Sequence, residues 1–212
     1  MFVRDAMVRH PLTIDVSTSL GEALALMDKH DVEGVPVLSG GKLAGVLTLW
    51  DILHAGVDVA TTPREFLDHT PVGNVMSRNV FTVREDDPIE QAAYIMSQKE
   101  IDVVPVLDRA DNVVGVISEP TMLKTFTLML GLQERGSRIT VEVEDRVGQV
   151  ARITGIIRDH GVSIASVSTY KEVEGRYYIV VRVRTAEPKA IVDALWQAGY
   201  KVVHVSQVWE EF

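Results

Sequence analysis

The sequence predicts an α+β protein with two copies of a β-α-β-β-α unit, followed by a ferredoxin-like β-α-β-β-α-β unit. Three observations predict it. Residues 3–38 and 72–107 carry one pattern twice, so that Val35-Pro36-Val37-Leu38 returns as Val104-Pro105-Val106-Leu107. Strand-like and helix-like stretches follow the same order in both copies. The residues after 138 do not continue the repeat and have an order of their own.

Each copy opens with a short extended segment, Thr13-Ile14 or Thr82-Val83, and continues into a helix. Apolar residues recur at helical spacing in both copies: Leu20, Ala23, Leu24 and Met27 in the first, and Ile89, Ala92, Ala93 and Met96 in the second. Ser19 and Glu22 have capping-box spacing at the first helix. Asp87 and Pro88 suit the N-cap and first helical position of the second.

Two strands and a further helix complete each copy. The expected strands are residues 35–38 and 43–47 in the first copy, and 103–107 and 113–117 in the second. Between the copies, Thr62-Pro63-Arg64-Glu65 predicts the start of a short helix. The last helix is expected over residues 121–135, ending at Gly136, with Leu123, Phe126, Thr127 and Leu130 on one face. We favour ordinary core packing for this helix, although Met122 and Met129 off that face indicate a second apolar contact.

The C-terminal unit alternates strands and helices. Strands are expected over residues 139–143, 162–170, 176–183 and 201–208, with a turn at Glu174-Gly175. One helix follows the first strand and ends near Gly161, and Glu187-Pro188 opens another. This order is the basis of the ferredoxin-like prediction.

Composition narrows the function classes. The net charge of −9 argues against nucleic acid or an anionic membrane as a partner, since both need a basic patch. The absence of cysteine excludes disulfides and thiolate chemistry. No apolar run approaches the ~20 residues that span a bilayer, and the N-terminus lacks a signal-peptide core, so we expect a cytoplasmic protein. Scattered histidines and the lack of catalytic motifs predict no metal site and no enzyme.

The repeat resembles a CBS-domain pair, with domains expected at residues 1–58 and 70–130. The resemblance rests on Met7 and Met76, on the Val-Pro-Val-Leu strands, and on Gly45-Val46-Leu47-Thr48-x-x-Asp51. Residues 138–212 resemble an ACT domain, through the Glu-Asp-Arg-Val-Gly run at 144–148 and the Gly-Val-Ser-Ile run at 161–164. A CBS pair followed by one ACT domain is similar to the acetoin-utilisation B-type (AcuB-like) proteins.

The CBS resemblance implies a regulatory ligand in the cleft between the repeats: AMP, ADP, ATP or S-adenosylmethionine. Asp51 would bind the ribose hydroxyls with help from Thr48, because a carboxylate offers two acceptor oxygens. The other repeat would contribute Thr82, Val103, Val104 and Pro105. The spacing of Thr48 and Asp51 also fits a helix cap without any ligand, and one residue can do both.

The second copy departs from this pattern, because Thr121 stands where the first copy has Asp51. The resemblance therefore implies a weaker second site, lined by Thr13, Val35, Pro36, Ser118 and Thr121. Candidate phosphate contacts are Arg78, Arg9 and Lys124.

The ACT resemblance implies an amino-acid site near Asp145, Gly148 and Ser163. The alternative, which we favour, makes Asp145 an N-cap, Gly148 a packing glycine, and the domain a dimerisation unit, so that the chain forms a homodimer. Our leading hypothesis is a non-catalytic sensor of an adenine nucleotide or adenosine derivative, acting through the ACT dimer or a partner protein. An amino-acid sensor and a ligand-free adaptor are the rivals.

Overall fold

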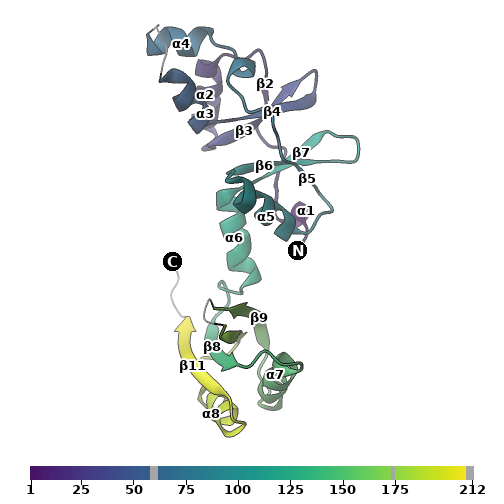
Figure 1. Ribbon diagram of the computed structural model, residues 1–212, viewed down its shortest axis with the longest axis vertical. Coiled ribbons are helices and arrows are strands. Elements are labelled where there is room, and N and C mark those ends of the chain that lie inside the picture. The colour runs from purple at the N-terminus through teal and green to yellow at the C-terminus, as the bar shows by residue number, and fades with distance from the viewer. Residues whose placement is uncertain (58–61, 173–174, 209–212) are drawn as a thin grey trace. The chain divides into compact units, whose positions relative to one another are not determined.

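The computed structural model describes residues 1–57, 62–172 and 175–208 (Figure 1). The chain divides into two units, residues 1–123 and 124–212. Residue 58, where the first domain was expected to end, Glu174 of the expected turn, and residues 209–212 lie outside the described residues. The expected domain boundaries stay predictions.

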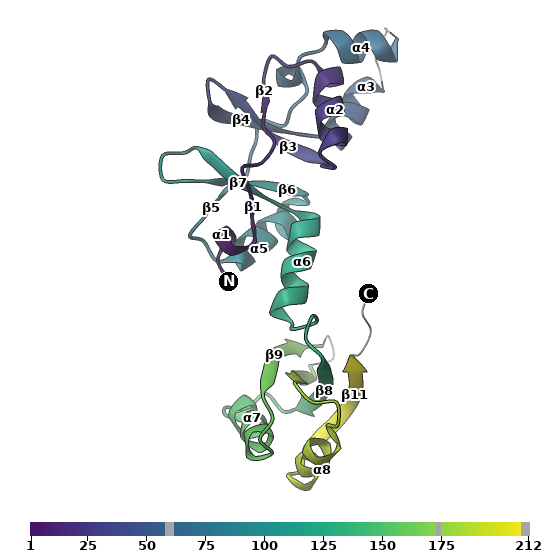
Figure 2. The same cartoon turned by 180° about the vertical axis from the view of Figure 1, so that it is seen from behind.

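The first unit holds the two copies of the repeat up to Leu123, and a short helix connects the copies in the sequence (Figure 2). The first copy comprises α1 (Val3–Ala6), β1 (Val8–Arg9), β2 (Ile14–Asp15), α2 (Leu20–Lys29), β3 (Gly34–Ser39), β4 (Lys42–Thr48) and α3 (Leu49–Gly56). After α4 (Pro63–His69), the second copy comprises η1 (Val72–Asn74), β5 (Val83–Arg84), α5 (Ile89–Lys99), β6 (Val103–Leu107), β7 (Val113–Ser118) and α6 (Glu119–Met129). The expected β-α-β-β-α order is confirmed in both copies.

Cap residues were predicted at the starts of α2 and α5, and only the one at α2 is confirmed. The Ser19 hydroxyl accepts a hydrogen bond from the Glu22 backbone N–H at 3.2 Å, which is one of the two bonds of the predicted capping box. The second prediction, Asp87 as N-cap and Pro88 as first helical residue, is wrong: Pro88 is the N-cap and α5 starts at Ile89. The Asp87 carboxylate instead accepts from the Arg84 backbone N–H at 2.7 Å.

The two copies exchange their leading segments. β1 precedes the first copy but pairs antiparallel with β7 of the second, where Val8 lies opposite Val116. Reciprocally, Ser77 ahead of the second copy forms a bridge with Val46 on β4 of the first. Val3 is fully buried in the core of the second copy, and Val72 is fully buried in the core of the first. Each core is therefore completed by the other copy.

The repeated Met and Gly residues meet across this exchange. A Cβ atom on Gly115 would lie 2.5 Å from the sulfur of Met7, and one on Gly45 would lie 2.5 Å from the sulfur of Met76. On Gly45 it would also lie 2.8 Å from the backbone oxygen of Ser77. The backbone contact leaves no room for a side chain at Gly45, and a side chain at Gly115 would have to displace Met7.

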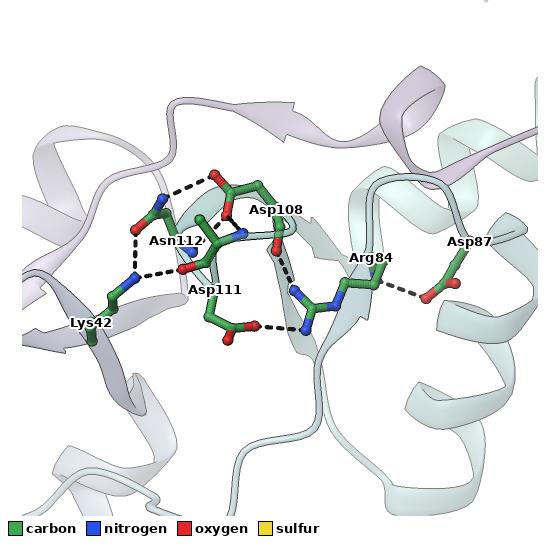
Figure 3. Close-up of polar contacts among 7 residues, drawn as sticks. Lys42, Arg84, Asp87, Asp108, Asp111 and Asn112 are labelled. Atoms are coloured by element: carbon green, nitrogen blue, oxygen red, sulfur yellow. Dashed lines mark hydrogen bonds and ion pairs between the residues drawn. The ribbon is translucent and has the colours of Figure 1, made fainter.

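A polar network joins the two copies at their hairpin turns (Figure 3). The Lys42 ammonium, at the start of β4, donates to the Ala110 carbonyl at 2.6 Å and to Oδ1 of Asn112 at 2.9 Å, both in the turn before β7. Asp108 orders that turn, because its Oδ1 accepts from the backbone N–H groups of Ala110 and Asn112 at 2.8 and 2.9 Å. Arg84 forms an ion pair with Asp111 at 2.7 Å.

The prediction for the last helix of the repeat is wrong in two respects. α6 ends at Met129 rather than at residue 135, and Gly131, two residues later, has a positive φ of 66°. The predicted core face is exposed: Leu123 is 60% and Phe126 48% accessible, whereas Met122 is buried. Periodicity found the apolar stripe but not what covers it.

The C-terminal unit has the predicted ferredoxin-like order. Its elements are β8 (Gly136–Val143), α7 (Gln149–Asp159), β9 (Ile164–Lys171), β10 (Tyr177–Val183), α8 (Lys189–Gln197) and β11 (Lys201–Val208). The antiparallel sheet has the order β11-β8-β10-β9. Both helices pack on one face of it, through Ile153, Ile157, Ile191 and Leu195 against Ile139, Val141, Ile179 and Val181. The opposite face carries the intervening residues of each strand.

Candidate functional site

Two cavities lie between the copies, at equivalent positions of the repeat. The first, which we call the Asp51 cavity, has a volume of about 190 Å³. The second, the Ser118 cavity, has a volume of about 390 Å³. Residues of the Asp51 cavity recur in the Ser118 cavity at the repeat offset: Val46 and Val116, Thr48 and Ser118, Ser77 and Val8, Phe81 and Leu12, Glu100 and Asp31, and Asp102 and Glu33. Each cavity therefore uses residues of both copies.

Thr48 and Asp51 hold each other at the start of α3. Oδ2 of Asp51 accepts hydrogen bonds from the Thr48 backbone N–H at 2.8 Å and from the Thr48 hydroxyl at 2.7 Å. The Thr48 hydroxyl in turn accepts from the Asp51 backbone N–H at 3.1 Å, which closes a capping box. These bonds leave Oδ1 of Asp51 without a partner among the described residues. The cap thus fixes the carboxylate at the cavity wall and leaves one oxygen available.

Three of the six residues predicted for the Asp51 cavity line it: Thr48, Asp51 and Val103. Thr82, Val104 and Pro105 do not. Val104 is fully buried in the core of the second copy, because successive residues of a strand face opposite sides.

The Ser118 cavity shows the same partial agreement. Val35, Pro36 and Ser118 line it, whereas Thr13 and Thr121 do not. The hydroxyls of Ser118 and Thr121 lie 3.0 Å apart in a hydrogen bond. This pair occupies the place of Thr48 and Asp51 but contains no carboxylate.

The cavities are acidic, which sequence reasoning missed. Asp51, Glu100 and Asp102 line the Asp51 cavity, and no lysine or arginine is among its lining residues. The Ser118 cavity is likewise lined by acids without basic residues: Asp31, Glu33, Asp102 and Glu119. The sequence contained a signal for these acids, because Asp31-Val32-Glu33 and Glu100-Ile101-Asp102 repeat the same acid-apolar-acid pattern just ahead of a strand. Asp31 and Glu100 also share a left-handed backbone, at φ 52° and 53°.

The candidate phosphate contacts do not line these cavities. The Arg78 guanidinium donates to the Gly73 carbonyl at 2.7 Å, and the equivalent Arg9 donates to the Arg4 carbonyl at 2.8 Å. Each arginine therefore hydrogen-bonds to the backbone of the segment ahead of its own copy. Lys124 belongs to the second unit and is exposed.

In the C-terminal unit, Asp145 and Gly148 line a cavity of about 410 Å³ beside the start of α7, and Ser163 does not. The alternative roles predicted for Asp145 as an N-cap and for Gly148 as a packing glycine are wrong. Gly148, not Asp145, is the N-cap of α7. Gly148 is not a packing glycine either, because a Cβ atom there would meet nothing within 4 Å. Its φ of 90° is what favours glycine.

No helix among the described residues has the length and apolar character to cross a membrane. Nor do they contain a cluster of three or more histidine or acidic side chains arranged to hold a metal ion.

Family models match most of the chain. The CBS domain model matches residues 3–58 and 72–127, and the ACT domain model matches residues 137–199. Among solved structures, the CBS domain pair of protein MJ0100, in complex with 5′-methylthioadenosine and S-adenosyl-L-methionine, is 31% identical with a TM-score of 0.53. The match covers 59% of this chain and 95% of that one. A Vibrio cholerae protein assigned to acetoin utilization (AcuB) is 28% identical with a TM-score of 0.55, over 63% of this chain and 95% of its own.

Curated relatives share the same region. The L-aspartate semialdehyde sulfurtransferase of Methanocaldococcus jannaschii is 33% identical over 125 residues, which are 58% of this chain and 23% of the relative. The chain thus spans about a quarter of that enzyme's length, and the shared part is the CBS pair. The CBS domain-containing protein YhcV of Bacillus subtilis is 32% identical over 55% of this chain and 79% of its own. The chain belongs to the CBS-domain family, with an ACT domain after its CBS pair.

Proposed function

We propose that the chain is a regulatory sensor that binds an adenosine derivative between its CBS repeats, with Asp51 as the principal contact to the ribose. The observation that carries this proposal is the free Oδ1 of Asp51 in a cavity built from both repeats. A carboxylate fixed through one oxygen presents the other to a ribose hydroxyl without further ordering of the side chain. Thr48 lies beside it in the same cavity.

The charge of the cavity selects among adenosine derivatives. Asp51, Glu100 and Asp102 would repel the phosphates of ATP, and no basic residue lines the cavity to offset them. S-adenosylmethionine carries a sulfonium, an ammonium and a carboxylate group, for a net positive charge, and 5′-methylthioadenosine is uncharged. The acidic wall therefore favours these two compounds over ATP and ADP. The complex of the MJ0100 CBS pair with both compounds supports this choice.

Size also bears on binding. The Asp51 cavity holds about 190 Å³, below the range of ~300–1,000 Å³ usual for small-molecule sites, so it has to widen around an adenosyl group. Trp50 lines the cavity and is 64% exposed, so this side chain can move aside at little cost in packing. The Ser118 cavity, at about 390 Å³, lies within the usual range but offers the weaker hydroxyl pair.

A thermal-shift panel tests the ligand class. We expect S-adenosylmethionine and 5′-methylthioadenosine to raise the unfolding temperature more than AMP, and AMP more than ADP or ATP. A ligand at about 100 times its dissociation constant adds roughly 2.7 kcal/mol of stability. A larger shift with ATP than with S-adenosylmethionine would refute the argument from charge.

One substitution separates the cap from the ribose contact. Asp51→Asn keeps an oxygen for the Thr48 donors but replaces the free Oδ1 by an amide donor, so the helix start survives while ligand affinity falls at least about tenfold. Glu65→Gln is the matched control, because Thr62 and Glu65 form the same capping box on α4 outside both cavities. Thr121→Ala should leave the shift intact. If Thr121→Ala abolishes the shift and Asp51→Asn does not, the site is wrongly assigned.

A second candidate function is amino-acid binding by the ACT domain. The cavity of about 410 Å³ at Asp145 and Gly148 favours it, because a carboxylate beside an open helix start suits an amino group and a carboxylate together. Branched, aromatic and small amino acids in the same panel test it. A shift that Asp145→Asn removes and Asp51→Asn leaves unchanged would support this second function.

Homodimerisation is part of the proposal. Exposed apolar side chains support it: Leu53 on α3 is 61% accessible, and Trp196 on α8 is 57% accessible. Such side chains lose water contact when two copies pair. One chain has a mass of 23.5 kDa, and light scattering on the intact chain should give twice that mass. A monomer at micromolar concentration would contradict this part.

A further inference from the structure

Two arginines lie directly opposite each other on the sheet face that α7 and α8 leave uncovered. Arg138 on β8 and Arg182 on β10 are cross-strand partners in the antiparallel pairing. Ser166 on β9 is the partner of Arg182 on its other side. Like charges at directly opposed positions destabilise a sheet unless something between them compensates.

Arg182 is buried, and its guanidinium group is not fully hydrogen-bonded within the described part of the chain. The residue is only 5% exposed, and its Nη1 has no hydrogen-bond partner among the described residues. Gly131 covers it, since a Cβ atom there would lie 3.5 Å from Cδ of Arg182. Burial, followed by the charge of Arg138, lowers the pKa of Arg182 below its ordinary value, yet an arginine stays charged at neutral pH.

The neighbouring acceptors are already engaged. The Glu134 carboxylate pairs with Arg184, and the Glu142 carboxylate accepts from Lys201 at 2.8 Å. The Leu130 carbonyl, at the end of α6, accepts from the Ser166 hydroxyl at 2.8 Å. One N–H of Arg138 donates to the Thr140 hydroxyl at 2.7 Å. These groups leave the charge of the arginine pair uncompensated, and an unpaired buried charge is costly.

A cavity of about 160 Å³ lies at this pair, and we propose that it binds a small oxyanion, a phosphate or a carboxylate, between Arg138 and Arg182. Its other lining residues include Ser168 and Tyr170, which add hydroxyl donors, and Leu130 and Leu132, which are apolar. Two guanidinium groups present forked N–H donors that match the oxygens of phosphate or carboxylate. The volume limits the ligand to a compact anion or to the anionic end of a larger one. The residues that line this site are distinct from those that line the Asp51 cavity.

Calorimetric titration of the intact chain with sodium phosphate and, separately, with sodium acetate tests the proposal. Sodium chloride keeps the ionic strength constant. We expect saturable binding at one site per chain for at least one of the two anions, and the arm that binds identifies the ligand as phosphate or carboxylate. Saturable binding of neither anion overturns the proposal.

Variants locate the binding. Arg182→Met should weaken anion binding at least about tenfold, because a methionine retains the bulk but none of the donors. Arg152→Met, on the exposed side of α7, is the matched control and should bind as the wild type does. Without added anion, Arg182→Met should unfold at a higher temperature than the wild type, because it removes an unpaired buried charge.

Two further measurements keep the test decisive. Arg138→Met replaces a less buried side chain and should also weaken binding if Arg182→Met fails to fold. Asp51→Asn should leave anion binding unchanged. Wild-type affinity in both arginine variants would overturn the proposal, whatever the outcome at the Asp51 cavity.

Discussion

A carboxylate that accepts several N–H donors stabilises the fold only while it is ionised, and Asp108 is such a group. The backbone N–H of Asn112, and next its side-chain amide, hold the pKa of Asp108 below its ordinary value, and the Ala110 N–H and the charge of Lys42 add to this. Hydrogen bonds from Ser17 likewise lower the pKa of Asp15, and hydrogen bonds from Thr62 lower the pKa of Glu65. Their contribution is complete above the unfolded pKa and is lost as pH falls through the folded one.

The first prediction concerns acid sensitivity. The wild-type chain should lose stability as pH falls from about 5 through the unfolded aspartate pKa near 4 and further below it. Asp108→Asn should lose less over that interval, because its amide cannot be protonated there, and should be less stable at neutral pH. Urea unfolding at a series of pH values measures both slopes. Parallel curves for the two proteins would show that Asp108 does not contribute.

At the scale of elements, the exchange of leading segments means that each CBS repeat depends on residues ahead of the other. Val3→Ala and Val72→Ala should each cost about 1–3 kcal/mol, since both side chains are fully buried. Hydrogen exchange shows where the cost falls. Val3→Ala should speed exchange first in α5 and β6, which belong to the second repeat, and Val72→Ala first in α2 and β3 of the first. The reverse assignment would contradict the exchange.

Periodicity predicted most of these elements but not that exchange. The repeat places Met7 and Met76 at equivalent positions, yet nothing local indicates that Met7 packs on Gly115 and Met76 on Gly45. Such contacts join residues far apart in sequence, and apolar spacing records only which face is buried. The end of α6 at Met129 was missed because it depends on local backbone conformation, which apolar spacing does not record. Gly131 was an internal glycine of an apolar stretch, and only its positive φ makes it a terminator.

The candidate site was predictable to the extent that its chemistry is local. Thr48 and Asp51 are three residues apart at a helix start, and the structure places both on the cavity wall. Val104 was chosen from a strand in which Val103 lines the Asp51 cavity and Val104 faces the core, because side chains alternate. The acids at 100 and 102 were missed because exposed carboxylates before a strand suggest solvent. Their repetition in both copies was the available signal.

At the scale of the molecule, a sensor must couple its ligand to something else, and linkage makes that coupling measurable. If an adenosine derivative at the Asp51 cavity acts on the ACT domain, then binding there changes the affinity of the arginine pair for its anion. By reciprocity, the anion changes the affinity for the adenosine derivative by the same factor.

Four titrations measure the two factors: S-adenosylmethionine with and without saturating anion, and anion with and without saturating S-adenosylmethionine. We expect equal factors of about 5 or more, the size of typical allosteric couplings. Asp51→Asn should bind S-adenosylmethionine poorly. At the same concentration of S-adenosylmethionine, the factor by which this compound changes anion affinity should therefore be one in this variant. If both factors equal one in the wild type, the two domains bind their ligands independently, and any regulatory output of the CBS pair passes to a partner protein rather than through the arginine pair of the ACT sheet.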